Sequence, residues 1–187
     1  MLLYGLLSWA LFLPLQAQNT DELKTVPHVD IKRYMGAWYE IGRLENPWEK
    51  ECSHNVVAIY TLQADGTVRV INQCQTGPQP TDIHRVEGTA WVTDKTSNAK
   101  LKVSFVHVPL IKWIASGDYW IIQLADDYSY AVVSEPSQKY LWILSRTPSL
   151  PPDIYQKILR SIAYQAPKVN ILHILPTKQD PLTELHF

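Results

Sequence analysis

The sequence predicts an all-β fold with one C-terminal helix, namely an eight-stranded antiparallel up-and-down β-barrel. Two observations carry this prediction: eight short strand-like segments separated by regular turn signals, and one helical apolar stripe after the last of them. The composition agrees, because seven Trp and ten Tyr against three Phe suit half-buried strands. Closing the strands into a barrel removes the edges that an open sheet would expose.

The N-terminal segment is expected to be a secretory signal peptide over residues 1–17, followed by one domain over 18–187 with its core at about 29–175. Leu2 to Leu15 is almost continuously apolar and too short to span a bilayer comfortably, and Ala17 offers a small residue at the cleavage point. No Lys or Arg precedes the apolar run, so a cleaved leader and a retained anchor both stay open. We expect an exported protein, periplasmic or secreted, with outer-membrane association as a further option. No Cys lies near the cleavage point, so we expect no lipobox anchor.

The barrel begins after Asp30, which can cap a short helical turn at Ile31–Tyr34. Asp65-Gly66 is a strong hairpin signal between the second and third strands, because this dipeptide tolerates a left-handed turn. The eight expected strands are Trp38–Leu44, Val56–Leu62, Thr67–Gln73, Val86–Thr93, Leu101–His107, Tyr119–Leu124, Tyr130–Ser134 and Tyr140–Ser145.

The pattern changes after the eighth strand. Pro151, Pro152 and Asp153 are typical of a helix start, and Ile154, Ile158 and Ile162 then recur every four residues. Pro167 ends this helix, which must pack on another element. A ninth short strand is expected at Val169–Ile174.

The net charge, the two cysteines and the spacing of the histidines exclude several classes of function. A formal net charge of −1 does not attract nucleic acid or an anionic membrane by bulk charge. Two Cys without a His at ligand spacing do not make a metal site, and the six His show neither HxH nor HExxH spacing. We therefore expect no catalytic residue, no metal and no cofactor. Cys52 and Cys74 would form a disulfide in an exported chain and two free thiols in a cytosolic one.

Alternation divides each strand into an apolar and a more mixed face. Period two alone does not say which face points inward, so a filled core and a ligand cavity both stay open. If the apolar faces line a cavity, the expected ligand-binding residues are Ala58, Tyr60, Val70, Val103, Phe105, Tyr119, Ile121, Val133, Tyr140 and Trp142.

Two runs carry a family resemblance: Lys32–Ile41, which contains Gly36-Ala37-Trp38-Tyr39, and Tyr140–Pro148, which contains Arg146. Together they resemble the lipocalin family, most closely its bacterial outer-membrane-lipoprotein and apolipoprotein D types. The first strand starts and the eighth strand ends at the same end of such a barrel, so Trp38 and Arg146 can stack there and close it, with Gly36 beside them. The family's Thr-Asp-Tyr-x-x-Tyr motif is altered, because Ala125 and Asp127 replace its Thr and first Tyr.

The resemblance implies binding, storage or transport of a fatty acid, a lysophospholipid or a similar amphiphile, without catalysis. Polar residues of the mouth (Lys112, His107 or Lys139) would meet the headgroup. The apolar loop over residues 108–117 would fold back as a lid, or touch a membrane or a partner, and a homodimer is an option. The Cys52–Cys74 bridge would also lie at the mouth, but the hairpin puts Cys74 opposite Val56 or Val57, so the chain must bend there. A lipocalin-scaffold enzyme and a filled-barrel interaction module are the alternatives.

Overall fold

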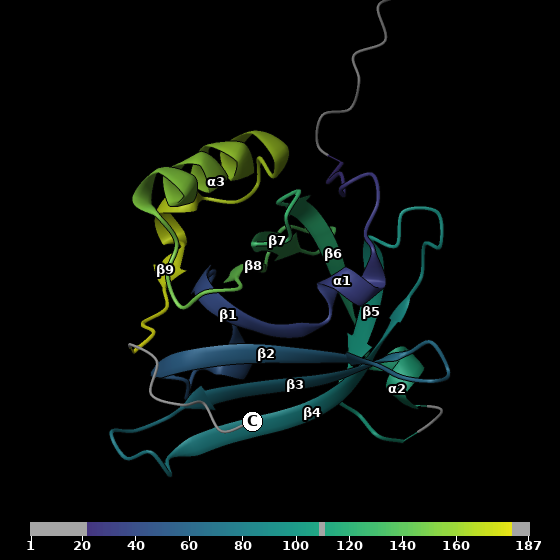
Figure 1. Ribbon diagram of the computed structural model, residues 1–187, viewed down its shortest axis with the longest axis horizontal. Coiled ribbons are helices and arrows are strands. Elements are labelled where there is room, and N and C mark those ends of the chain that lie inside the picture. Colours follow the sequence, from purple (N-terminus) through teal and green to yellow (C-terminus); the bar gives the residue numbers. More distant parts are fainter. Residues whose placement is uncertain (1–21, 109–110, 181–187) are drawn as a thin grey trace, which may run out of the picture.

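The computed structural model describes residues 22–108 and 111–180, so the expected signal peptide lies outside the described residues. Its main feature is a closed antiparallel barrel (Figure 1). The eight strands are β1 (Gly36–Arg43), β2 (His54–Leu62), β3 (Val68–Gln75), β4 (Ile83–Val92), β5 (Lys100–Ser104), β6 (Gly117–Leu124), β7 (Tyr130–Ser134) and β8 (Leu141–Ser145). Each strand pairs with the next, and β1 closes the ring by pairing with both β8 and β2. The predicted eight-stranded barrel is confirmed.

The predicted local signals form as expected around the barrel. Gly66 has a φ of +83°, and the Asp65 carboxylate accepts the Thr67 N–H in the β2–β3 turn. Asp30 caps α1 (Ile31–Tyr34) by accepting the N–H groups of Lys32 and Arg33 at 2.9 and 3.2 Å. Short polar side chains therefore satisfy the free donors at these chain reversals.

The molecule has two apolar clusters, one on each side of the barrel wall. The inner cluster contains Trp38, Ile121, Val133 and the other inward residues of the strands. The outer cluster joins α3 (Pro152–Gln165) to the outward residues of β6, β7 and β8 through Ile158 and Ile162. Figure 1 shows α3 lying outside the barrel along these strands. The helical stripe that the sequence predicted thus has a partner surface.

Several predicted strand ends lie a few residues from the observed ones, and two differences have a clear local cause. β5 ends at Ser104 rather than His107, because the Ser104 hydroxyl donates to the Ala115 carbonyl and accepts the Val106 N–H, which turns the chain out of the sheet. The segment Val169–Ile174 is not a strand. It contains the 3₁₀ turn η2 (Ile171–His173), where the Asn170 side chain accepts the Leu172 N–H.

The ninth strand, β9 (Leu175–Pro176), pairs with β1 instead. β1 pairs with β2 only over Gly36–Tyr39, and β9 takes the same edge of β1 where β2 diverges. The following residues continue along this gap: the Thr177 N–H donates to the Ile41 carbonyl, and the Asn55 N–H donates to the Lys178 carbonyl. We call Leu175–Asp180 the C-terminal strap, because it closes the seam between β1 and β2 at one end of the barrel.

Candidate functional site

The closed end of the barrel is built around Trp38 and Arg146. The Arg146 guanidinium lies 3.7 Å from the centroid of the Trp38 ring and donates to the carbonyls of Ala37 and Arg33, both at 2.8 Å. The indole N–H of Trp38 donates to the Tyr34 carbonyl at 2.9 Å. Because Trp38 is fully buried, this arrangement plugs one end of the barrel.

Gly36 is required beside this plug. Its φ is +96°, a conformation that side chains rarely adopt, and a Cβ at this position would lie 3.4 Å from the guanidinium of Arg146. The loop between β6 and β7, which carries the altered family motif at Ala125 and Asp127, is held at this end by contacts of Tyr128. The Tyr128 hydroxyl accepts the Asp30 N–H at 2.8 Å, and Arg33 stacks on the Tyr128 ring at 4.0 Å. Tyr128 therefore secures the loop despite the altered motif.

A cavity of about 850 Å³ opens from the interior towards the other end of the barrel, so the described barrel is not filled. Eight of the ten residues expected to bind a ligand line it: Ala58, Tyr60, Val70, Val103, Phe105, Tyr119, Tyr140 and Trp142. Ile121 and Val133 do not line the cavity. They are fully buried in the inner cluster, where they pack under the cavity with Trp38.

The floor of the cavity carries three tyrosines that the apolar pattern did not single out as a group. The Tyr119 hydroxyl shares hydrogen bonds with those of Tyr34 at 2.8 Å and Tyr60 at 3.1 Å. Burial raises the pKa of all three phenols, that of Tyr60 to about 12. The floor is therefore a neutral polar cluster that offers hydroxyl groups but no charge.

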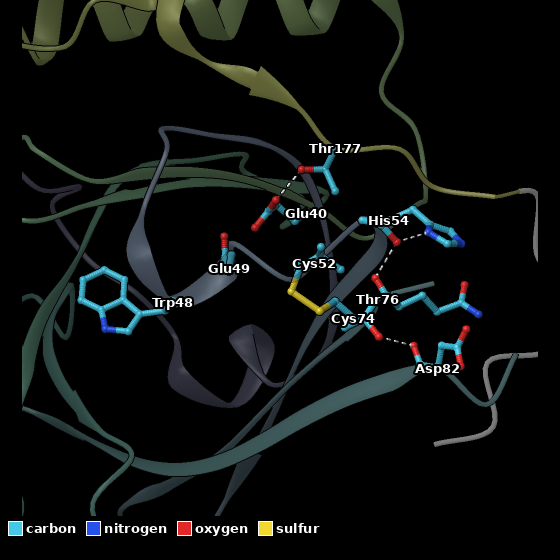
Figure 2. Close-up of a disulfide and its surroundings, with 12 residues drawn as sticks. Glu40, Trp48, Glu49, Cys52, His54, Cys74, Thr76, Asp82 and Thr177 are labelled. Carbon is cyan, nitrogen blue, oxygen red and sulfur yellow. Dashed lines mark hydrogen bonds between the residues drawn. A yellow bond between two sulfur atoms is a disulfide. The ribbon is translucent and has the colours of Figure 1, made fainter. Parts of the chain in front are cut away.

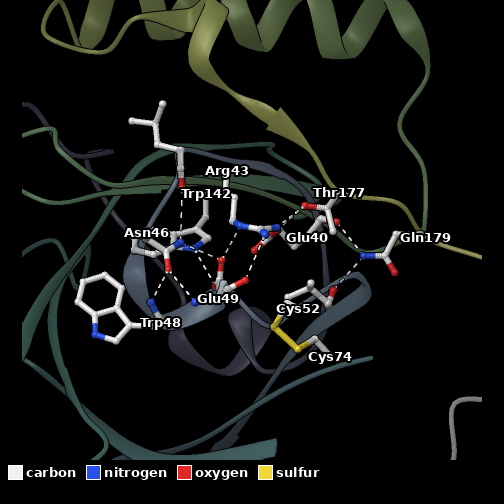
Figure 3. A network of polar contacts seen from close by, with 12 residues as sticks. Glu40, Arg43, Asn46, Trp48, Glu49, Cys52, Cys74, Trp142, Thr177 and Gln179 are labelled. Carbon is white, nitrogen blue, oxygen red and sulfur yellow. Dashed lines mark hydrogen bonds and ion pairs between the residues drawn. A yellow bond between two sulfur atoms is a disulfide. The ribbon is translucent and has the colours of Figure 1, made fainter. Parts of the chain in front are cut away.

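The mouth carries a network of charged side chains (Figure 3). Arg43 bridges two carboxylates: its Nη1 lies 2.7 Å from Glu40 and its Nε 2.9 Å from Glu49. The Thr177 hydroxyl of the strap also donates to Glu40. Burial and the Glu49 charge raise the pKa of Glu40 to about 7, against the opposing effect of Arg43.

A β-bulge in β1 makes this network possible. The register with β8 shifts between Glu40, opposite Leu144, and Gly42, opposite Ile143, so Arg43 falls opposite Trp142. Without the extra residue, Glu40 and Arg43 would point to opposite faces of the strand. The bulge therefore places both on the inner side, with the Trp142 indole N–H donating to Glu49 at 3.2 Å.

The predicted disulfide joins Cys52 to Cys74 with a Cα–Cα distance of 5.5 Å (Figure 2). The bend that it requires is present in the first residues of β2. The β2–β3 register shifts between His54 and Val57, and Asn55 has a φ of +52°. Cys52 therefore reaches Cys74 although the regular pairing would leave it too far along the strand. Both cysteines line the mouth of the cavity.

An aromatic group also borders the mouth. Trp48, in the 3₁₀ turn η1 (Pro47–Glu49), meets Tyr140 edge-on with ring centroids 4.7 Å apart. Tyr140, which directly precedes β8, has its ring centroid 6.3 Å from that of Trp142 in β8. The Asn46 side chain fixes η1 by accepting the N–H groups of Trp48 and Glu49, both at 3.1 Å. We call Trp48, Tyr140 and Trp142 the aromatic rim.

The loop over residues 108–117 packs partly on the outside of the barrel in its described part, and a lid stays a prediction. It contains the short helix α2 (Ile111–Ile114), whose Trp113 packs against Trp91 of β4 with ring centroids 4.5 Å apart. Trp91 alternates with the cavity-lining Ala90, so this contact lies on the outer face of the barrel. Ile114 is 87% exposed. Ala115, Ser116 and Gly117 at the end of the loop line the cavity, so the described part borders the mouth while Trp113 packs outside the barrel.

The residues expected to meet a headgroup are placed differently from the expectation. His107 and Lys139 are exposed and do not line the cavity, and the side chain of Lys112 lies outside the described residues. The charged residues at the mouth are instead Glu40, Arg43 and Glu49. Sequence reasoning missed them, although Glu40 occupies an inward position of β1 and Gly42, a glycine inside a strand, is a typical bulge signal.

The chain matches a family model described as a lipocalin-like domain over residues 29–177. This chain belongs to the lipocalin family. Among curated relatives it is 34% identical to temperature-induced lipocalin-1 of Arabidopsis thaliana over 86% of both chains. It is 38% identical to the outer membrane lipoprotein Blc of Citrobacter freundii over 79% of this chain and 78% of that protein. It is 36% identical to apolipoprotein D of Rattus norvegicus over 66% of this chain and 64% of that protein.

The fold comparison agrees with the family assignment. Insecticyanin from the tobacco hornworm Manduca sexta superposes on this lipocalin with a TM-score of 0.63, over 83% of this chain and 84% of that one, at 18% identity. Within the described residues no group of three or more His, Cys, Asp or Glu could hold a metal ion. Over the same residues, no helix has the length and apolar character needed to cross a membrane.

Proposed function

We propose that this lipocalin binds and carries a small amphiphile, inserting its apolar chain into the barrel without chemical change. The observation that carries the proposal is the cavity of about 850 Å³, which is apolar over most of its lining and closed at one end by Trp38 and Arg146. Each buried CH₂ contributes about 0.8 kcal/mol, so an acyl chain of about ten carbons contributes about 8 kcal/mol against the cost of ordering the ligand.

Two further observations support a carrier rather than an enzyme. Both cysteines form the disulfide, so neither provides the thiolate that a pocket-cysteine enzyme would need. The tyrosines of the floor have raised pKa values and stay neutral, which removes them as bases near neutral pH. The disulfide also supports export to an oxidising compartment, either the periplasm or the exterior of the cell.

Calorimetric titration of residues 18–187 with a lysophospholipid and a long-chain fatty acid tests the carrier function. We expect saturable binding of at least one of them with micromolar or tighter affinity. Ala58→Phe should weaken binding at least about tenfold, because Ala58 lines the cavity halfway along β2. The matched control is Ile59→Phe, which changes the next residue, on the opposite face of the same strand. Equal binding by the two variants, or no saturable binding by the unchanged protein, would contradict the carrier function.

Delivery at a membrane surface forms part of the same proposal. Trp113 and Ile114 in the loop over residues 108–117 are 58% and 87% exposed, and exposed apolar patches usually mark a contact surface. We expect Ile114→Asp to reduce co-sedimentation with phospholipid vesicles while ligand affinity in solution stays unchanged. Unchanged co-sedimentation would remove membrane contact from the proposal, and homodimer formation stays a separate prediction.

A further inference from the structure

The charges that line the cavity are of one sign. Among the described residues of the lining, Glu40, Glu49, Asp118 and Glu135 are acidic, none is Lys or Arg, and His84 is the one histidine. A ligand that enters this cavity therefore meets carboxylates, because Arg43, the cation of the mouth network, is paired with Glu40 and Glu49 and does not itself line the cavity.

These four carboxylates differ in how strongly they are already paired with a cation of the protein. Arg43 is shared between Glu40 and Glu49, so a single positive charge faces two acidic groups. Asp118 is paired with Lys102 at 3.0 Å. Glu135 forms no ion pair within the described part of the chain.

Glu135 is held in place by neutral donors. Its carboxylate accepts the N–H groups of Ser137, Lys139 and Tyr140 at 2.7, 2.6 and 3.2 Å. Burial alone would raise the pKa of Glu135, but the hydrogen bonds from Ser137, Lys139 and Tyr140 outweigh it and lower the pKa below its usual value. The group is therefore a fixed negative charge next to Tyr140 of the aromatic rim.

The aromatic rim lies between these charges. Trp142 donates its indole N–H to Glu49 at 3.2 Å, and Tyr140 lies between Trp142 and Trp48 at 6.3 and 4.7 Å between ring centroids. Trp48 is 63% exposed, so its ring is open to a ligand at the mouth. Three electron-rich rings with two carboxylates beside them match a positively charged nitrogen, and quaternary ammonium groups in particular bind to such aromatic groups.

The same arrangement disfavours an anionic headgroup. A carboxylate drawn into the mouth would lose hydration without gaining a cationic partner from the described lining, and it would be repelled by Glu49 and Glu135. The fatty acid expected from the family resemblance is therefore the weaker candidate for this chain.

Resting on the carrier function above, we propose that this lipocalin selects amphiphiles with a positively charged nitrogen, and that a quaternary ammonium headgroup binds at the aromatic rim beside Glu49 and Glu135.

The test compares ligands that share one alkyl chain and differ in headgroup: decyltrimethylammonium, decanol and decanoate, each below its critical micelle concentration and at about pH 8, where decanoate is ionised. We expect the ammonium compound to bind at least about tenfold more tightly than decanoate, with decanol between them. Equal affinities, or tighter binding of decanoate, would overturn the inference and leave the carrier function intact. Failure of all three to bind would instead count against the carrier function itself.

Two matched tryptophan variants test whether the aromatic rim causes the preference for the ammonium headgroup. Trp48→Ala should reduce the affinity for decyltrimethylammonium about fivefold or more and leave that for decanol nearly unchanged. Trp113→Ala removes an equally exposed tryptophan outside the cavity and should change neither affinity. Glu135→Gln, checked for folding by circular dichroism, should narrow the difference between the ammonium compound and decanoate. If Trp48→Ala reduces the affinity for all three ligands by the same factor, Trp48 only makes an apolar contact with the alkyl chain, and the role of the rim in headgroup selection is overturned.

A second pair of ligands distinguishes two sources of the headgroup. Lysophosphatidylcholine and lysophosphatidic acid with the same acyl chain differ by the choline group. Preference for the choline lipid would support the inference and identify a phospholipid source. Tight binding of decyltrimethylammonium without binding of the choline lipid would support it with a simpler alkylammonium as the source. Preference for lysophosphatidic acid would overturn it.

Discussion

Individual side chains fix the two ends of this barrel by different means. At the closed end, Arg146 combines a ring contact with Trp38 and two hydrogen bonds to carbonyls that are otherwise distant in the chain. At the mouth, a single cation, Arg43, holds two carboxylates together. The first arrangement contributes to stability, whereas the second makes the mouth sensitive to protonation.

Replacing Arg146 by Ala should lower the free energy of unfolding by about 2–4 kcal/mol, since it removes the stacking on Trp38 and leaves the carbonyls of Ala37 and Arg33 without their donors. Arg146→Lys should recover part of this loss, because an ammonium keeps the charge but not the planar fork. Arg160→Ala, an exposed arginine on α3, is the control. Urea unfolding measures all three, and equal stability of the Arg146→Ala and Arg160→Ala variants would contradict the structural role of the plug.

Glu40 should make stability fall as the pH rises. Its pKa is raised from 4.5 to about 7 by burial and by Glu49, so between these values the folded state holds a proton that the unfolded state has released. The resulting stabilisation is fully present below about pH 4.5 and is lost as the pH passes about 7, with an upper limit of about 3 kcal/mol. Glu40→Gln should flatten this slope in thermal unfolding measured from about pH 5 to about pH 8. If stability depends on pH to the same extent in the Glu40→Gln variant, a group other than Glu40 causes this pH dependence.

At the scale of elements, the strands and the helix followed from local patterns, whereas the irregular segments did not. Period-two alternation and turn dipeptides identified all eight barrel strands, because each strand has one apolar face and a polar turn at its end. The bulge in β1 and the position of β9 depend on pairing between distant segments, which a local pattern does not contain. The sequence therefore indicated most of the cavity lining but not the charged network at its mouth.

The attachment of α3 to the barrel can be tested at one residue. Ile158 is fully buried between the helix and the outer faces of β6, β7 and β8, so Ile158→Ala should cost about 2–4 kcal/mol of stability. Tyr164→Ala on the same helix is the control, because Tyr164 is 89% exposed. Ligand affinity should not change in either variant, since the helix lies on the far side of the barrel wall from the cavity. A cost below about 0.5 kcal/mol for Ile158→Ala would show that the helix is only loosely attached.

The disulfide ties the segment after η1 to β3 and should stabilise both the fold and the mouth. It spans a sequence separation of 22 residues, for which loop closure alone contributes about 3 kcal/mol. Replacing both Cys52 and Cys74 by Ser should lower stability by about that amount. The variant should also weaken ligand binding, because Trp48 and Glu49 would lose the anchor that follows them in the chain. Unchanged affinity with lowered stability would restrict the bridge to a purely structural role.

For the whole molecule, the closed ring separates a packed end from an open end. Ile121 and Val133 were expected at the ligand and are instead part of the packing above Trp38, because side chains fill the barrel at the closed end and leave space only towards the mouth. Alternation identifies which residues point inward but not how deep the packing extends. Depth depends on the volumes of side chains from all eight strands together.

Removing the C-terminal strap should loosen the seam between β1 and β2 without unfolding the closed end. Deleting residues 175–187 removes the Lys178 carbonyl that accepts the Asn55 N–H and the Gln179 side chain that donates to the carbonyls of Glu40 and Val56. Hydrogen exchange at Asn55 should therefore become faster, while amides of β1 paired with β2 near Gly36 stay protected. Deleting only residues 181–187 is the control and should leave Asn55 protected. Protection of Asn55 in both deletions would contradict the role of the strap.

The seam also sets the order in which the molecule can be completed during synthesis. β1 is the first strand to emerge from the ribosome, but its partners include β8, the last of the eight barrel strands, and the strap that follows α3. The ring therefore has no means of closing until β8 has been made, and up to that point the strands remain an open meander. For the export proposed above, this delay would keep the chain free to cross a membrane as an extended thread before the barrel closes.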